Sequence, residues 1–540
     1  MIVARHWVAP LVALAVTSSA AAQAKGGAKA ASDSCTMTTD KPDELKDATS
    51  QLVFAQMGKA DAQKKALMKA MEKLSRRADY YAANSSGHAF LLGEAFVLWS
   101  LQPGEPPVVK RGDLGLLGEK EQTIDLLKTA DSAFTVVEKA MPACTDQTSV
   151  YRKMPWTRLI NQVGSLLNAD QLDSATATLD RSMVIYRNSP FTAYFQGQVA
   201  YRRDEYAKAT GYFEKAYQMA APEVAKDSSL AVIAEYSSFF APYTGARAAA
   251  VLSDTAQKAA YRRVGALYTA YLKNYPCSNF AENAERGLFE ALRTAGDTAA
   301  VRAQLQSMTV ETKPCSDIWW YSAAREASDM GASALAVELA DKAVAFSPWS
   351  AGLGNAAGAY FTAKAYAKLL PVAKRLTEVA PNSADNWQML ALAYQGLGEG
   401  AAPAVKKAYN DSLMTAYNSG EKLAVSVRIT EFSSDGPKRT MGGQLGLVDN
   451  TPPPPAPSTA STKGGKGAKG AKPPPPPPPP PAAPKAQPKQ VTVKVDFLDR
   501  SGAVVASQSK ELMVNATEKT PFALSVENAK IVGYRYAPIP

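Results

Sequence analysis

Histidine is scarce in this sequence of 540 residues, with His6 and His88 as its two copies. His6 lies in a segment that we expect to be removed on export, which leaves His88 for the mature chain. Serine and cysteine triads need a histidine, and zinc sites usually have one, so the sequence argues against these enzyme classes. His88 lies in an apolar stretch and is interpreted as a packed core residue rather than a base. A glycosidase-like carboxylate pair stays open, although no pattern marks two of the 50 acidic residues.

A phosphate-binding loop is also missing, because the sequence contains no G-x-x-x-x-G-K-[ST] motif. Residues 464–472 (GGKGAKGAK) carry glycines and lysines but lack the hydroxyl ligand and the flanking strand and helix. We therefore expect no catalytic residue, no cofactor and no metal site, and interpret the protein as non-enzymatic.

Cysteine is scarce as well, and none of the four copies forms a C-x-x-C pair. In an oxidising compartment, an even number of spaced cysteines favours disulfides over metal ligands. Cys277 and Cys315 each lie in a Pro-Cys-Ser triplet that opens a helical stretch. Of the three connectivities that four cysteines allow, we predict Cys35–Cys144 and Cys277–Cys315.

The apolar run Val8–Val16 is too short to cross a bilayer. With Arg5 before it and Ala-Gln-Ala at 22–24 after it, this run is typical of an export signal that is cleaved near Ala24. An uncleaved anchor is the alternative. Cys35 lies too far from the apolar run to form a lipoprotein box. The sequence therefore predicts an exported protein, periplasmic or associated with the cell envelope.

A helical pattern occurs twice, 34 residues apart, between Asp170 and Ala216. The first copy consists of Asp170, Leu172, Ala175, Thr176, Leu179 and Ser182. The second copy consists of Asp204, Tyr206, Ala209, Thr210, Phe213 and Ala216. Three pairs are identical, two keep a bulky side chain and the last keeps a small one. A period of this length indicates stacked helix pairs that share one core.

The same register returns further along the chain, where Pro348 and Pro381 each close a unit. A signature of the form W-x2-L-A-x2-Y is made by Trp387, Leu390, Ala391 and Tyr394. The chain therefore resembles the tetratricopeptide repeat family over about 150–418, with units at about 156–189, 190–223, 316–348, 349–381 and 382–417. The resemblance implies a solenoid with a concave surface that binds protein segments. Residues 224–315 depart from the pattern, and helical hairpins there are expected from amphipathic spacing alone.

Residues 41–145 are expected to form a helical region of no recognised family, after a flexible segment at 25–40. Asp61–Asn84 has one apolar stripe and is predicted to be a helix. His88–Leu101 is apolar on all sides and is expected to lie in the interior. Pro103–Gly118 is predicted to be a loop, with the helical pattern resuming over Glu119–Met141.

After the predicted solenoid at 146–420, the apolar period changes to two, which is typical of strands. Strands are expected over 423–430, 439–448, 491–497, 503–512, 521–526 and 530–537. A loose G-x-L at Gly443 and a V-x-V-x-F at Val493 resemble the small β-sandwich module called FxLYD-like, as do a D-x-x-G turn at Asp499 and the closing Tyr534-Arg535-Tyr536. The resemblance implies one sandwich built from 421–450 and 491–540. The alternative is a linker between a solenoid cap and a separate domain.

Residues 451–490 are rich in proline, lysine, glycine and alanine, include nine consecutive prolines, and are predicted to be a disordered insertion. The segment has no acidic residue and six lysines, namely Lys463, Lys466, Lys469, Lys472, Lys485 and Lys489. It is either a solvated spacer or a contact for an anionic envelope polymer or membrane surface. No aromatic residues alternate with the lysines, so specific nucleic-acid recognition is not expected.

The mainly α fold, with its repeats and β-sandwich, favours a non-catalytic scaffold or adaptor that grips a protein or peptide segment. Tyr, Trp and Arg commonly anchor interfaces. The residues predicted to face the groove are Tyr194, Gln198, Tyr201, Arg202, Trp320, Gln388 and Gln395. Two alternatives remain: a structural subunit of a stable envelope or membrane-associated complex, and an electrostatic tether acting through residues 451–490.

Overall fold

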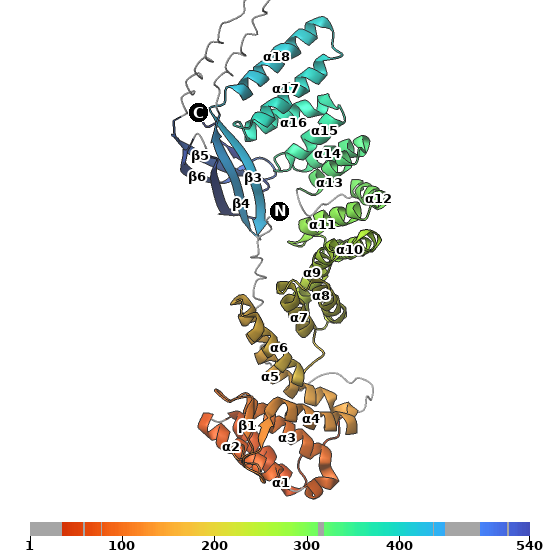
Figure 1. The fold of residues 1–540 in the computed structure, drawn as a ribbon, viewed down its shortest axis with the longest axis vertical. Coiled ribbons are helices and arrows are strands. Elements are labelled where there is room, and N and C mark those ends of the chain that lie inside the picture. The colour runs from red at the N-terminus through yellow and green to blue at the C-terminus, as the bar shows by residue number, and fades with distance from the viewer. Residues whose placement is uncertain are drawn as a thin grey trace, which may run out of the picture. The chain divides into compact units, whose positions relative to one another are not determined.

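The computed structural model describes residues 35–57, 60–76, 78–310, 318–435, 437–448, 487–515 and 518–540. Within these ranges the chain is mainly helical, with eighteen α-helices, two short strands near the start and six strands at the end (Figure 1). It divides into two compact units, unit 1 (Met1–Tyr271) and unit 2 (Leu272–Pro540). None of the described helices combines the length and the apolar character needed to span a membrane.

Unit 1 begins with a bundle formed by α1 (Asp43–Met57), α2 (Ala60–Leu74), α3 (Ser85–Ser100) and α4 (Leu126–Ala140). The third helix is buried along most of its length, as its apolar sequence predicts. The single helix predicted over 61–84 is wrong, because α2 ends at Leu74 and a 3-10 helix follows from Ala78. The Asn84 side chain accepts the Gly87 N–H at 3.0 Å, which caps a new helix at that point.

The predicted loop at 103–118 contains strand β1 (Val108–Lys110), which pairs with β2 (Thr123–Asp125). The next helix therefore begins at Leu126 rather than at Glu119. Asp125 sets this start, since its carboxylate accepts the Lys128 N–H at 3.0 Å.

The predicted Cys35–Cys144 disulfide is confirmed, and it joins residues 109 positions apart in the sequence. Cys277 is also disulfide-bonded. Cys315, its predicted partner, lies outside the described residues.

Helical hairpins follow in both units, and neighbouring helices of each hairpin pack against one another. In unit 1 they begin with α5 (Thr145–Asn168), α6 (Leu172–Ile185), α7 (Pro190–Arg202), α8 (Tyr206–Ala220) and α9 (Leu230–Ala250), and α10 (Asp254–Asn274) runs across the boundary. In unit 2 they are α11 (Ala281–Thr294), α12 (Thr298–Thr309), α13 (Trp319–Asp329), α14 (Ser333–Phe346), α15 (Leu353–Thr362), α16 (Tyr366–Val379), α17 (Ala384–Gly398) and α18 (Pro403–Glu421). Ala175 and Ala209, which the sequence places at close contacts, are fully buried.

The turns inside these hairpins share one backbone device. A residue with positive φ follows the first helix of five pairs, namely Asp170, Asp204, Gly296, Gly331 and Lys364. In each turn the next N–H bonds to a carbonyl five residues earlier, as Asp297 does to Leu292 at 2.9 Å. This is the Schellman ending of a helix. The device recurs at Gly296, inside the segment where the sequence repeat is lost.

The C-terminal strands form two three-stranded antiparallel sheets, ordered β3-β4-β7 and β6-β5-β8. The strands are β3 (Val425–Asp435), β4 (Lys438–Leu447), β5 (Lys489–Leu498), β6 (Val504–Val514), β7 (Thr520–Glu527) and β8 (Gly533–Tyr536). Met441 from one sheet and Phe497 from the other share a single buried core. The strands β4 and β5, which flank the proline-rich segment, are therefore parts of one sandwich. Residues 449–486 of that segment lie outside the described residues.

The sandwich packs directly against the helices of its own unit. Val379 and Ala380, at the end of α16, belong to the sandwich core, and Trp349 packs on its edge. The Ala351 N–H donates to the Val532 carbonyl at 3.1 Å. A Cβ added to Gly533 would lie 1.8 Å from the Trp349 carbonyl oxygen, so this contact requires glycine. The β-module and the last hairpins thus form one folded body.

Asn382, in the loop between α16 and α17, links the helices to strand β3 and to the segment that follows β8. Its side chain is 2% exposed and donates to the carbonyls of Val425 (2.9 Å) and Ile539 (2.7 Å). Its Oδ1 accepts the Ile539 N–H at 2.8 Å, and its carbonyl accepts the Val427 N–H at 3.0 Å. A single buried residue therefore holds the loop against β3 and against the C-terminal segment that follows β8.

Candidate functional site

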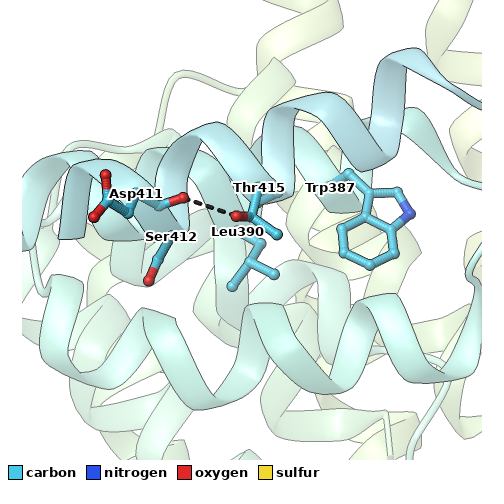
Figure 2. Close-up of a pocket in the computed structure, with 6 residues that line it drawn as sticks. Trp387, Leu390, Asp411, Ser412 and Thr415 are labelled. Carbon is cyan, nitrogen blue, oxygen red and sulfur yellow. Dashed lines mark hydrogen bonds between the residues drawn. The ribbon is translucent and has the colours of Figure 1, made fainter. Parts of the chain in front are cut away.

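An open hollow of about 260 Å³ lies between α17 and α18. Its lining consists of Trp387, Leu390, Asp411, Ser412, Thr415 and Ala416. Figure 2 shows the Trp387 indole at one end and the side chains of Asp411 and Ser412 at the other. The hollow is thus apolar at one end and polar at the other.

Most polar groups of this hollow are already bonded within the chain. The Thr415 hydroxyl donates to the Asp411 carbonyl at 2.8 Å (Figure 2), and the Ser412 hydroxyl donates to the Ala408 carbonyl at 3.0 Å. The Trp387 N–H donates to the Pro381 carbonyl at 2.7 Å. The hollow is suited to contact with a partner side chain.

Gln388 and Gln395, both predicted to face the groove, are exposed on α17. They are seven residues apart and therefore lie on the same side of the helix. Each amide offers two donors and one acceptor oxygen, which suits recognition of an extended main chain.

The equivalent positions one repeat earlier were not predicted from the sequence. Gly354 and Phe361 precede Gln388 and Gln395 by 34 residues, and they lie on α15. A Cβ added to Gly354 or to Gly358 would meet no heavy atom within 4 Å, so neither glycine is required by packing inside the chain. The Phe361 side chain is 37% exposed. Applying the 34-residue period to Gln388 would have identified this face.

Trp320, the third predicted groove residue of unit 2, packs inside the repeats instead. Its side chain is 5% exposed, and its indole N–H donates to the Met308 carbonyl at 2.9 Å.

The four groove residues predicted in unit 1 are mostly engaged by their own hairpins. Tyr194 and Gln198 are buried and bonded to each other at 3.1 Å, and burial raises the pKa of Tyr194 above its usual range. Arg202 donates to the Leu167 carbonyl and pairs with Asp170 at 3.5 Å. Burial raises the pKa of Tyr201 to about 12. These residues therefore stabilise the stack of α5 to α9 rather than forming a free surface.

Tyr201 also belongs to an aromatic cluster that the sequence did not reveal. The Arg247 guanidinium lies over the rings of Tyr243 (5.0 Å), Tyr206 (5.4 Å) and Tyr201 (5.8 Å). It also donates to the Tyr243 hydroxyl at 2.8 Å and to the Tyr206 hydroxyl at 3.2 Å. Arg247 therefore occupies the cation position of its own aromatic cage.

His88 is held by neighbours in the N-terminal bundle. Its ring stacks on Tyr81 with centroids 4.1 Å apart, and its Nε2 lies 2.7 Å from the Leu74 carbonyl. Burial lowers the pKa of His88, which favours the neutral ring with Nε2 as donor. These contacts agree with the interpretation of His88 as a packed residue.

Comparison with known proteins adds no family to this description: no protein-family model matches the chain, and no curated protein matches it. Within the described ranges, no group of three or more His, Cys, Asp or Glu side chains could hold a metal ion.

Of the six lysines of the proline-rich segment, Lys489 begins β5 and its Nζ donates to the Pro540 carbonyl at 2.5 Å. The other five lie outside the described residues.

The buried carboxyl of Glu94 is the main titrating group of the N-terminal bundle. It is 5% exposed on α3 and bonds to Gln56 of α1, at 2.9 Å, and to Tyr151 of α5. Burial raises the pKa of Glu94 to about 7, because desolvation of the carboxylate outweighs these two hydrogen bonds.

We predict that Glu94 makes the bundle less stable as pH rises. The folded pKa of Glu94 is higher than the ordinary glutamate pKa of about 4.5, so the folded state binds more protons, and stability is lost as pH rises from about 4.5 toward 7. Between pH 5 and 8 the loss from this group is about 2 kcal/mol. Glu94→Gln should remove it, as measured by urea unfolding at both pH values, whereas exposed Glu72→Gln should behave like wild type. Subtracting the free energy of unfolding of the variant from that of wild type cancels the contribution of His88, whose lowered pKa changes stability with pH in the opposite direction. An equal pH dependence in wild type and Glu94→Gln would contradict this assignment.

Proposed function

We propose that the protein is an exported scaffold or adaptor that holds a segment of another protein on the face formed by α15 and α17. We further propose that its hairpins are of the tetratricopeptide type. The observation that carries the proposal is a set of exposed positions in equivalent register: Gly354 and Phe361 on α15, and Gln388 and Gln395 on α17.

The two glycines of α15 support a binding role because neither the packing around them nor their backbone conformation requires glycine. Gly358 lies in the interior of α15, where glycine costs about 1 kcal/mol relative to Ala. Neither Gly354 nor Gly358 has a positive φ, and neither has a neighbour within 4 Å of an added Cβ. Close approach of a partner main chain is a function that needs such bare backbone. Phe361 would supply an apolar contact beside it, and the two glutamines would bond to the partner's peptide groups.

Export is supported by the disulfide between Cys35 and Cys144, which is compatible with an oxidising compartment. In that setting we propose a periplasmic or envelope-associated location.

The proposal is tested by filling the bare surface of α15 with Gly358→Arg. Gly211 of α8 is a matched control, since it is also a helical glycine with nothing within 4 Å of an added Cβ. Both substitutions should leave the melting temperature unchanged or raise it. We expect Gly358→Arg to reduce capture of partner proteins from envelope extracts by about tenfold, a loss of about 1.4 kcal/mol, while Gly211→Arg captures like wild type. Equal capture by the two variants would contradict the proposed face.

A further inference from the structure

Helix α18 ends the stack of hairpins with an uncovered face. It packs chiefly against α17 (Figure 1), and Ala416 is its one buried residue. Met414 is 53% exposed and Tyr417 is 51% exposed. Positions 406, 410, 413, 414, 417 and 421 follow three- and four-residue spacing and therefore form one face of the helix.

The corresponding side of the preceding hairpin is covered by the next helix. The Asn386 side chain of α17 donates to the Leu376 carbonyl of α16 at 2.9 Å. A Cβ on Gly396 of α17 would lie 2.4 Å from the Tyr366 ring of α16. No described helix continues the stack beyond α18, so among the described residues this face has no helix stacked on it.

The residues of this face are arranged symmetrically about the point between Leu413 and Met414. Lys406 lies seven residues before Leu413, and Glu421 lies seven residues after Met414. Asn410 and Tyr417 are related in the same way at three residues. In an antiparallel pair of two such helices, each residue faces its symmetry mate, because a two-fold axis makes the interface self-complementary.

We propose that α18 pairs with α18 of a second copy, antiparallel about a two-fold axis at Leu413 and Met414. The apolar centre is then Leu413 against Met414, flanked on each side by Asn410 against Tyr417. Lys406 of each copy lies opposite Glu421 of the other, which gives two ion pairs. Among the described residues neither Lys406 nor Glu421 has an ion-pair partner within its own chain, so both are available.

The order of the charges on this face favours a second copy of the chain as the partner. A base near the start and an acid at the end of the face match an identical helix only when it runs antiparallel. One helix pair buries less than the roughly 1,200 Å² of a standard stable interface. The dimer should therefore be weak, with a dissociation constant on the order of 10 to 100 μM.

Sedimentation equilibrium of the mature protein at low ionic strength, over roughly 1 to 300 μM, tests the pairing. The average mass should rise from monomer toward dimer. Lys406→Glu and Glu421→Lys should each weaken association by about tenfold or more, because each places like charges opposite one another. The double variant restores opposite charges and should return to within about threefold of wild type.

Apolar variants provide an independent check on the same helix. Met414→Lys should keep the protein monomeric, whereas Val405→Lys should associate like wild type. Val405 is also exposed, at 48%, but lies about 100° around the helix from Lys406. A monomeric wild type over the whole range would overturn the proposal and leave this face to another protein. A double charge variant that stays as weak as the single variants, or a Val405→Lys that dissociates as Met414→Lys does, would also overturn it.

Discussion

Replacing Arg152 with methionine should lower the free energy of unfolding of unit 1 by about 3 to 5 kcal/mol. Arg152 is 8% exposed and donates to Glu138 at 2.8 and 3.1 Å, to the Ile185 carbonyl at 3.0 Å and to Asp131. Methionine fills the space but leaves the Glu138 carboxylate without its cation, while Asp131 keeps only the exposed Arg187 at 3.1 Å. Urea unfolding, with hydrogen exchange to localise the change to α4, α5 and α6, measures the effect.

Arg203→Met is the matched control for Arg152. Arg203 pairs with Asp173 at 2.7 Å, but the Asp173 side chain is fully exposed, so the pair contributes about 1 kcal/mol or less. Similar losses in the two variants would mean that the Arg152 network is no more important than a surface ion pair.

Asn382→Ala should destabilise the attachment of the sandwich by about 3 to 4 kcal/mol, since three side-chain hydrogen bonds are lost and their buried main-chain partners remain. The affected groups are the carbonyls of Val425 and Ile539 and the Ile539 N–H. Hydrogen exchange of β3 and of the C-terminal segment around Ile539 should accelerate before that of α13 and α14. Asn418→Ala, at an exposed position of α18, should change stability by less than about 0.5 kcal/mol. Unchanged protection of β3 in Asn382→Ala would contradict the role given to this residue.

The sequence predicted the helices in which the spacing of apolar residues follows directly from the packing of one helix on the next. Ala175, Ala209 and Phe213 are buried where the 34-residue pattern places them. The repeat in α11 and α12 escaped detection, because it is kept by the positive φ of Gly296 and its hydrogen bonds rather than by similar side chains. The division of residues 61–84 escaped for a related reason: an amphipathic stripe does not show where a side chain such as Asn84 caps the next helix.

The candidate groove was predicted in part for a different physical reason. Gln388 and Gln395 are polar, and their exposure on α17 follows from helix spacing. Tyr194 and Trp320 are aromatic residues that serve an interface or a core equally well, and tertiary packing buries both. Gly354 and Gly358 carry no side-chain signal, so their exposure becomes informative only when the surrounding space is known. The packing of Trp349 and Asn382 against the sandwich joins segments far apart in sequence, which no local pattern encodes.

Site-specific photo-crosslinking in intact cells tests the proposed binding face most directly. A photoreactive residue at Gln388 or Gln395 should give a discrete adduct with another protein. The same residue at Lys374, which is exposed on α16, should give none. Gly358→Arg should abolish the adducts at Gln388 and Gln395. Adducts that form equally at Lys374, or that survive Gly358→Arg, would contradict a specific groove on α15 and α17.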